Sequence, residues 1–173
     1  MDHETYSDDY IRGILQDCKS IAVVGASAKP VRPSFFVVKY LISKGYDVIP
    51  INPGLAGGEI CGAKVYASLR DIDRPIDMVD IFRNSAAAFG VVEDVLALDP
   101  LPKAVWMQLT IFNQDAATMA EDAGLRVVMN RCPKIEYARL SREIGWVGVA
   151  SNVISSKRPV LQKGYQRFGI VQD

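Results

Sequence analysis

The chain has 173 residues, of which 49% are hydrophobic and 23% charged, enough for one globular domain with a sizeable core. Its 20 basic and 20 acidic residues balance, which argues against a nucleic-acid or membrane-surface partner. No apolar stretch approaches the roughly 20 residues of a membrane span, and the acidic start "MDHETYSDDY" differs from a secretory signal. Three scattered cysteines without a CxxC pair indicate reduced thiols, so we expect a cytoplasmic protein.

Strand-like and helix-like segments alternate along the chain. The apolar, β-branched run "SIAVVG" is typical of a buried strand, and the helical spacing of apolar residues after Pro33 is typical of a helix. Continued to the C-terminal end, the same reasoning predicts strands at 20–25, 46–52, 76–82, 103–109 and 125–130, and helices at 33–44, 86–97, 113–123 and 134–143.

This alternation predicts an α/β fold, a single Rossmann-like domain with a mostly parallel sheet of about five strands and helices on both faces. We expect the domain at residues 17–144, after an N-terminal extension at 1–16 and before a C-terminal arm at 145–173. The arm would pack on its own domain or on a second subunit.

The carboxyl ends of parallel strands meet at one edge of the sheet, where ligands bind. Each predicted strand here is followed by small, amide, hydroxyl or cationic groups. The segments concerned are 25–27, 52–53, 82–84, 108–110 and 130–132. We therefore treat these five strand ends as one candidate binding site.

The loop after the first predicted strand has the features of a phosphate-binding loop. Its glycine permits a tight turn, its small residues leave room for a phosphate, and free amides at the following helix start attract anions. Two cations lie nearby, although the same pattern also fits a solvated turn. The candidate residues are Gly25, Ala26, Ser27, Lys29, Arg32, Pro33 and Ser34.

The second predicted strand ends without an acid. NAD-binding folds place an Asp or Glu there to bind the ribose hydroxyls. This chain has Asn52 and Pro53 instead, which argues against NAD. The ring of Pro53 suits an adenine face, and Asn52 can bind either the adenine edge or a backbone group.

The motifs "AVVGAS…RPS…YLISKGYDVIPINP", "VDIFR", "AVWMQL" and "VVMNRC" together resemble the stand-alone CoA-binding domain family. That family is similar to the CoA-binding domains of succinyl-CoA synthetase and of ADP-forming acyl-CoA synthetases. The resemblance covers roughly residues 17 to 142. It implies a Rossmann-like fold that binds coenzyme A, with adenine near the "NP" turn and phosphates near the first loop. Asn130 and Tyr137 replace an acid and a histidine that are usual in the family.

Coenzyme A suits the residue types at these strand ends. Its charge is about −4 near neutral pH, because each phosphate contributes roughly −1 to −2. Its pantetheine arm needs apolar walls and amide partners. The phosphates would be bound by Lys29, Arg32, Arg83 and Arg131, and the arm would be lined by Phe82, Trp106 and Gln108, although Phe82 and Trp106 are equally compatible with core packing.

The sequence gives little indication of catalysis. The single histidine, His3, falls in a segment expected to be mobile, and Asp77 and Asp80 fall on opposite faces of one strand. Cys132 is either a reactive thiol whose pKa is lowered by Arg131 and a helix start, or a small buried thiol. We therefore expect no enzyme activity, no metal and no catalytic residue.

The predicted function is binding of CoA or an acyl-CoA by a non-catalytic or regulatory module. One alternative is an NADP-type redox module, which would use the same fold. Another is a subunit that needs a separate ATP-grasp partner for acyl-CoA synthetase activity. A homo-oligomer also fits the sequence.

Overall fold

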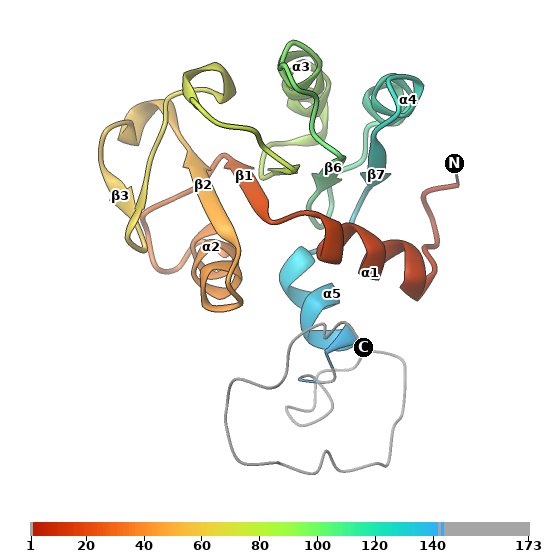
Figure 1. Ribbon diagram of the computed structural model, residues 1–173, viewed down its shortest axis with the longest axis horizontal. Coiled ribbons are helices and arrows are strands. Elements are labelled where there is room, and N and C mark those ends of the chain that lie inside the picture. The colour runs from red at the N-terminus through yellow and green to blue at the C-terminus, as the bar shows by residue number, and fades with distance from the viewer. Residues whose placement is uncertain (1, 142, 144–173) are drawn as a thin grey trace.

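The computed structural model describes residues 2–141 and 143. Its centre is a five-stranded parallel sheet with the order β2-β1-β5-β6-β7 (Figure 1). A two-stranded antiparallel hairpin, β3 with β4, follows β2. The strands are β1 (Ser20–Val24), β2 (Asp47–Ile51), β3 (Glu59–Ile60), β4 (Ala63–Lys64), β5 (Met78–Ile81), β6 (Ala104–Met107) and β7 (Arg126–Val128).

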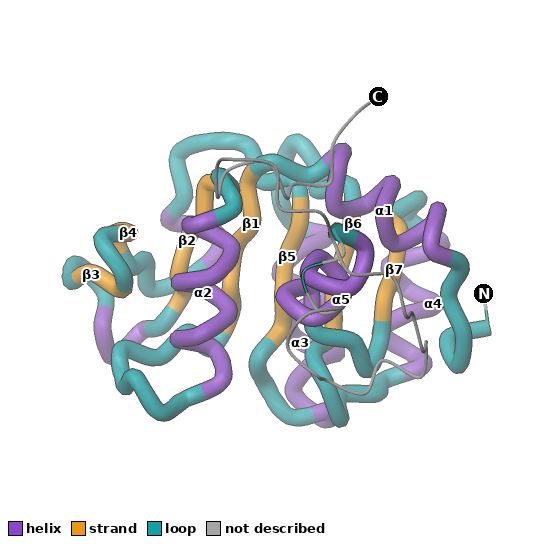
Figure 2. Tube along the Cα trace, turned by 90° about the horizontal axis from the view of Figure 1, so that it is seen from below, coloured by secondary structure: helices purple, strands orange, loops and turns teal. Residues whose placement is uncertain are grey.

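Helices cover both faces of the sheet. Figures 1 and 2 show α1 (Asp8–Asp17), α2 (Pro33–Ser43) and α5 (Pro133–Leu140) on one face. The other face carries α3 (Ser85–Leu96) and α4 (Gln114–Asp122), and two 3-10 turns, η1 (Pro53–Leu55) and η2 (Leu69–Asp71), lie in the loops. This arrangement confirms the predicted Rossmann-like α/β fold with a single domain.

The alternation of side chains along each strand produces two hydrophobic cores. In β1, Ile21 and Val23 belong to the core under α1, α2 and α5, whereas Ala22 belongs to the core under α3 and α4. Every predicted strand and helix is present, with boundaries that differ by a few residues. The last helix ends at Leu140, and residues 142 and 144–173, including the predicted arm, lie outside the described residues.

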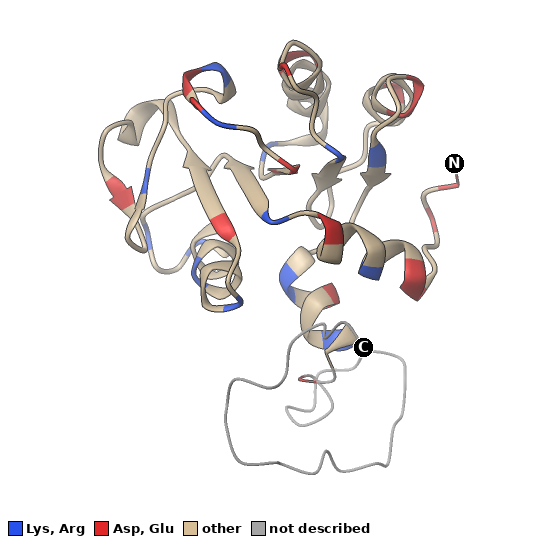
Figure 3. Cartoon of the chain, in the orientation of Figure 1, with Lys and Arg blue, Asp and Glu red and all other residues tan. Residues whose placement is uncertain are grey.

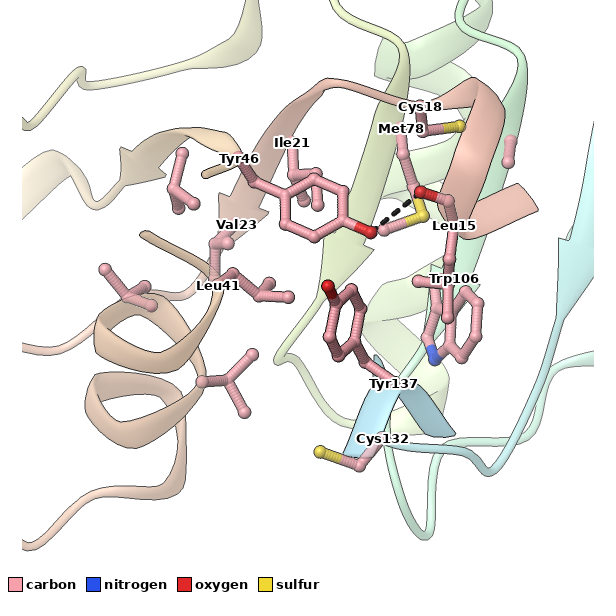
Figure 4. Packing of buried hydrophobic residues seen from close by; sticks show 14 of the residues in the cluster. Leu15, Cys18, Ile21, Val23, Leu41, Tyr46, Met78, Trp106, Cys132 and Tyr137 are labelled. Carbon is pink, nitrogen blue, oxygen red and sulfur yellow. Dashed lines mark hydrogen bonds between the residues drawn. The ribbon is translucent and has the colours of Figure 1, made fainter. Parts of the chain in front are cut away.

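Helix α1 is a finding that the sequence analysis did not predict, because residues 1–16 were treated as an extension. Its Ile11, Ile14 and Leu15 are at most 1% exposed and belong to the same core as β1. Figure 4 shows Leu15 in this core, where its carbonyl oxygen accepts a hydrogen bond of 2.7 Å from the Tyr46 hydroxyl.

Tyrosine hydroxyls from residues before and within α1 also form hydrogen bonds with backbone groups along β7, the edge strand of the sheet. The Tyr10 hydroxyl accepts from the Val127 amide at 3.0 Å and donates to the Val127 carbonyl at 3.1 Å. The Tyr6 hydroxyl accepts from the Met129 amide at 2.7 Å, and the two tyrosine rings stack 5.8 Å apart. Two side chains thus replace a neighbouring strand, and an uncovered edge is avoided.

His3 was expected in a mobile tail, and the structure corrects this expectation. Its side chain is buried, with a residue exposure of 6%. Its Nδ1 lies 2.9 Å from the Tyr6 hydroxyl, and its Nε2 lies 3.5 Å from Glu121 Oε1 on α4. Burial lowers the pKa of His3, and Glu121 opposes this shift only in part.

Figure 3 shows both basic and acidic side chains on α1 and α5, whereas the charged side chains of α3 and α4 are all acidic. None of the helices within residues 2–141 has the length and apolar character that crossing a membrane requires.

We expect Tyr10→Phe to lower the free energy of unfolding by about 1–3 kcal/mol, because it leaves the amide and carbonyl of Val127 without their partner. Urea unfolding followed by circular dichroism measures the change. Tyr66→Phe is the matched control, since the Tyr66 hydroxyl has no hydrogen-bond partner within the described residues. Equal stability of the two variants would contradict the role given to Tyr10.

Candidate functional site

The candidate site lies where the strand order reverses. The chain leaves β1 through α2 to reach β2 on one side, and the next long strand, β5, pairs with β1 on the other side. In open α/β sheets, the crevice beyond the carboxyl ends of two such strands is the usual place for a ligand. Gly25 and Phe82 follow β1 and β5 at this position.

Gly25 has a backbone conformation and an environment that only glycine tolerates. Its φ is +88°, and a Cβ added to it would lie 2.6 Å from the carbonyl oxygen of Phe82. The amides of Gly25 and Ala26 donate to the Ile51 carbonyl at 3.0 and 3.2 Å. These two amides therefore fix the loop, and the helix start that follows is the part of it to which the sequence analysis assigned the anion.

Asn52 also fixes the first loop. Its Nδ2 donates to the Ala26 carbonyl at 2.7 Å, and its Oδ1 accepts from the Gly54 amide at 2.9 Å. Of the two partners weighed for it, an adenine edge or a backbone group, the structure gives the backbone group. Ala26 is fully buried, whereas Ser27 is partly exposed and its Oγ accepts from the Lys29 amide at 3.2 Å. Pro53 is exposed at the start of η1.

The start of α2 has no side-chain cap. Its N-cap residue is Arg32, which offers no acceptor, and Pro33 occupies the first turn. By contrast, α3 and α4 are capped by the side chains of Asn84 and Asn113. Pro33 has no amide proton and the Phe35 amide donates to the Arg32 carbonyl at 3.0 Å, so the Ser34 amide is the first-turn donor that remains for an anion. Lys29 and Arg32 are exposed beside it and have no ion-pair partner within the described residues, while Ser34 is buried.

A groove of about 720 Å³ extends from this helix start along the strand ends to α5. Its walls are mostly apolar side chains from α2, from the loop after β6 and from α5, while Gln108 and Cys132 contribute its buried polar groups. The sequence-predicted site residues that line it are Pro33, Phe82, Arg83, Gln108 and Cys132.

Two residues that the sequence analysis assigned to the ligand, Trp106 and Arg131, belong neither to the first loop nor to the groove lining. Trp106 is fully buried in the core that Figure 4 shows. Its Nε1 donates to the Arg131 carbonyl at 2.8 Å. It shares a sheet face with Gln108 but lies two residues further from the strand end, so the core covers it. Arg131 turns away from the groove: its guanidinium lies 5.5 Å from the centre of the Tyr6 ring and donates to the Glu4 carbonyl at 3.0 Å.

Cys132 does not have the activated thiol that one of the two hypotheses required. Burial raises its pKa, and the Ile135 amide at the start of α5 opposes this only in part. Arg131, which was expected to lower that pKa, is engaged by the N-terminal segment instead. The structure therefore favours the second hypothesis, a small buried thiol that lines the groove.

An acid that the sequence analysis set aside lies behind the groove floor. Asp80 is fully buried, and both its carboxyl oxygens lie 3.0 Å from Nε2 of Gln108, which donates to them. Burial raises the pKa of Asp80 to about 8, because the hydrogen bond from Gln108 only partly offsets desolvation. A carboxyl held neutral in this way fixes the amide of Gln108 without adding charge to the groove.

Asp77, three residues earlier, has the opposite environment at the amino end of the sheet. Burial alone would raise its pKa, but Lys103 and the amides of Lys19 and Ser20 outweigh it and lower the pKa to about 2. The ammonium of Lys103 lies 2.7 Å from its Oδ1. The expectation that Asp77 and Asp80 form no acid–base pair agrees with these separate environments.

The groove wall after β6 is held in a rarely populated backbone conformation. Thr110 has a φ of +69° and Asn130 one of +53°, although neither is a glycine. The Thr110 amide donates to Asn130 Oδ1 at 2.8 Å. Asn130, which replaces the usual family acid, therefore has a structural partner at the edge of the site. Such local strain is frequent where loops form binding sites.

Comparisons with known proteins agree with this location. The family model described as "CoA binding domain" matches residues 19–138. The YneT protein of Bacillus subtilis (strain 168) is 41% identical over 128 residues, which cover 74% of this chain and 92% of that protein. A solved structure of a hypothetical protein from Pyrococcus horikoshii OT3 superposes with a TM-score of 0.73 at 39% identity, covering 80% of this chain and 98% of that one.

A third relative is the alpha subunit of ADP-forming acetate–CoA ligase I from Pyrococcus furiosus. It is 42% identical over 69 residues, which cover 36% of this chain but only 14% of that subunit. The likeness is therefore to a small part of a much longer protein.

The buried acid leads to a testable pH dependence. Between about 3.9, the pKa of an unfolded aspartate, and about 8, the folded protein holds a proton on Asp80 that the unfolded chain releases. The free energy of unfolding should therefore fall as pH rises through this range, and Asp80→Asn should reduce the fall. Urea unfolding at pH 5 and pH 8 measures it.

Asp77→Asn is the control for this test. The pKa of Asp77 is lowered, so its stabilising contribution is complete above about pH 4 and is lost only as pH falls toward 2. The variant should thus be less stable at both pH values and keep the wild-type difference between them. An Asp80→Asn variant with that same difference would show that Asp80 is ionised in the folded protein.

Proposed function

The chain belongs to the CoA-binding domain family, and from this premise we propose that it binds coenzyme A as a non-catalytic module. The observation that carries the proposal is the uncapped start of α2, flanked by Lys29 and Arg32, at the point where the strand order reverses. In the proposed complex, adenine lies by the turn at Pro53, the phosphates lie by residues 27–34, and the pantetheine arm runs along the groove.

The phosphate end requires positive potential without a fixed counter-ion. Lys29 and Arg32 meet this requirement because they are exposed and unpaired within the described residues. The first turn of α2 adds the positive end of a helix dipole and the amide of Ser34. Arg83 is also exposed, and its Cδ lies 3.2 Å from the position of a Cβ at Gly25, which places this third cation beside the first loop.

The arm requires an apolar trough with a few polar partners. The groove supplies the trough, and Gln108 supplies a partner whose amide nitrogen is already bound to Asp80. The carbonyl oxygen of Gln108 is then the atom left to accept from an amide of the arm. Asp80 acts here as a positioning residue, since it is fully buried and lies behind Gln108.

The environment of the titratable groups supports a binding module. Asp80 is fully buried behind Gln108, and burial raises the pKa of Cys132, which favours its neutral thiol over the nucleophilic thiolate. His3 lies at β7, where Tyr6 and Glu121 contact it. A second candidate function, a subunit that acts with a separate ATP-grasp chain, is favoured by the likeness to the Pyrococcus furiosus ligase subunit.

We expect the protein to bind CoA more tightly than dephospho-CoA, NAD or NADP. CoA carries an additional phosphate compared with dephospho-CoA, and the second strand ends in Asn52 where an NAD site has an acid. Calorimetric titration with the four ligands measures the order of affinities. Equal or tighter binding of NAD or NADP would overturn the proposal in favour of a redox module.

Ser27→Glu should weaken CoA binding at least tenfold, because it places a carboxylate where the phosphates are proposed to lie. Ser27 is chosen over Ala26, since a glutamate at the fully buried Ala26 would destabilise the fold itself. Ser43→Glu, at the other end of α2, is the control and should leave the affinity unchanged. Equal affinity of the Ser27→Glu variant and the control would place the phosphates elsewhere.

A further inference from the structure

We propose that the groove between α2 and α5 receives the hydrocarbon acyl group of an acyl-CoA thioester. This inference rests on the proposed CoA binding and extends it to the group that the cofactor carries. It identifies the ligand class as acyl-CoA with an apolar chain, in preference to free CoA and to thioesters of dicarboxylic acids.

The first argument is the position of the groove. Its lining begins at Val31 and Pro33 and continues to Ile135, and it includes neither residues 25–27 nor residues 52–53. The adenosine proposed by Pro53 therefore lies outside it, and the phosphates proposed by residues 27–34 lie at its end beside Val31 and Pro33. A volume of about 720 Å³ falls in the range of roughly 300–1,000 Å³ that holds an entire drug-sized ligand. This space is left for the arm and for a group attached to its sulfur.

The second argument is the clustering of exposed apolar side chains. Eight large hydrophobic residues are exposed in the described part of the chain, and four of them line this groove. They are Val31 (81% exposed), Phe36 (49%), Leu109 (48%) and Ile135 (40%). They come from three separate segments that the fold brings to one place. An apolar patch of this kind marks a binding surface.

A hydrocarbon chain matches this patch better than the arm alone. The pantetheine arm carries two amide groups, which need polar partners, and Gln108 is the buried amide that the groove offers. A saturated chain needs no partner and gains free energy from each methylene that it buries against Phe36 and Ile135. The chain would thus cover surface that free CoA leaves in water.

The charged groups around the groove disfavour an acid at the end of the acyl chain. Gln108, Cys132 and the neutral Asp80 behind them contribute no positive charge to its inner end. Lys134 lines the wall on α5, but its ammonium lies 5.7 Å from the centre of the Tyr40 ring, in a cation–π contact. Arg83 also lines the groove, but it lies against Gly25, where the proposed phosphates would engage it. A carboxylate placed among Phe36, Leu109 and Ile135 would therefore lose its hydration without gaining a free cation.

The test compares CoA, octanoyl-CoA and succinyl-CoA by calorimetric titration of the full chain, below the concentration at which octanoyl-CoA aggregates. We expect octanoyl-CoA to bind at least about tenfold more tightly than CoA, a gain that burial of about two methylenes supplies. Succinyl-CoA should bind no more tightly than CoA. Equal affinity of CoA and octanoyl-CoA, or tighter binding of succinyl-CoA than of octanoyl-CoA, would overturn the inference while leaving CoA binding intact.

A pair of matched variants locates the chain. Phe36→Ser should lose most of the octanoyl gain, taken as the ratio of octanoyl-CoA to CoA affinity within the same variant, because Phe36 lines the groove. Phe112→Ser removes a phenylalanine of similar exposure (52%) that is not part of the lining, and should keep the gain. An equal gain in both variants would overturn the location. A wild-type protein that binds neither CoA nor octanoyl-CoA would overturn the proposed function and this inference together.

Discussion

The contact between the backbones of Gly25 and Phe82 is the constraint on which the site depends. Parallel pairing of β1 and β5 continues to the sheet edge, where the Phe82 amide still donates to the Val24 carbonyl at 2.8 Å. The chain must turn immediately after this bond, and a Cβ at Gly25 would lie 2.6 Å from the Phe82 carbonyl oxygen. Because Gly25 has no side chain, the two strand ends can remain paired and the crevice above them stays open.

The turn at residues 25–26 is also hydrogen-bonded to the end of β2. The Ile51 carbonyl accepts from two amides of the turn, and Asn52 binds the Ala26 carbonyl from the other side. The polar groups of residues 25–26 are thus satisfied by β2, which leaves Ser27 and the start of α2 as the parts of the loop that face outward. The end of β2 therefore fixes residues 25–26, and Ser27 with the start of α2 forms the part of the loop that a ligand can reach.

The helix starts show how the chain divides its residues between folding and binding. Side-chain caps at Ser7, Asn84 and Asn113 stabilise α1, α3 and α4, each by about 1 kcal/mol. At α2 and α5, whose first turns both line the groove, this contribution is absent, since Arg32 and Cys132 make no side-chain cap. Local departures from the most stable choice concentrate at binding sites, where a ligand supplies the missing partner. The positive φ of Thr110, on the opposite wall of the groove, is a second departure of this kind.

Fold class and strand ends were predictable because short apolar runs closed by Gly25 or by Asn52 carry strong local signals. Helix α1 also has such a signal, with Ser7 as cap, two acids in its first turn, and Ile11, Ile14 and Leu15 at helical spacing. It was missed because the segment precedes the family resemblance and was taken for an extension. The sequence therefore contains the signal for this helix, but the extent of the family resemblance was given more weight.

Other parts of the site depend on distances that a linear pattern does not contain. Trp106 and Gln108 share one face of β6, and only the covering by α5 and the Arg131 carbonyl decides that one is core and the other lines the groove. Arg131 was assigned to the ligand as a cation at a strand end. Its direction is set by Glu4, which is 127 residues away in the chain, and by the ring of Tyr6.

The position of Arg131 also determines how charge is distributed along the binding edge. With Arg131 drawn to the N-terminal segment, the exposed cations of the edge are Lys29, Arg32 and Arg83, at the β1 and β5 end. At the β6 end the buried groups are an amide, a thiol and a carboxyl whose pKa burial raises. A ligand aligned with this gradient has anionic phosphates at one end and an uncharged group at the other. Acyl-CoA has this polarity along its whole length, so under the proposed function the asymmetry of the site would favour one orientation of the bound ligand.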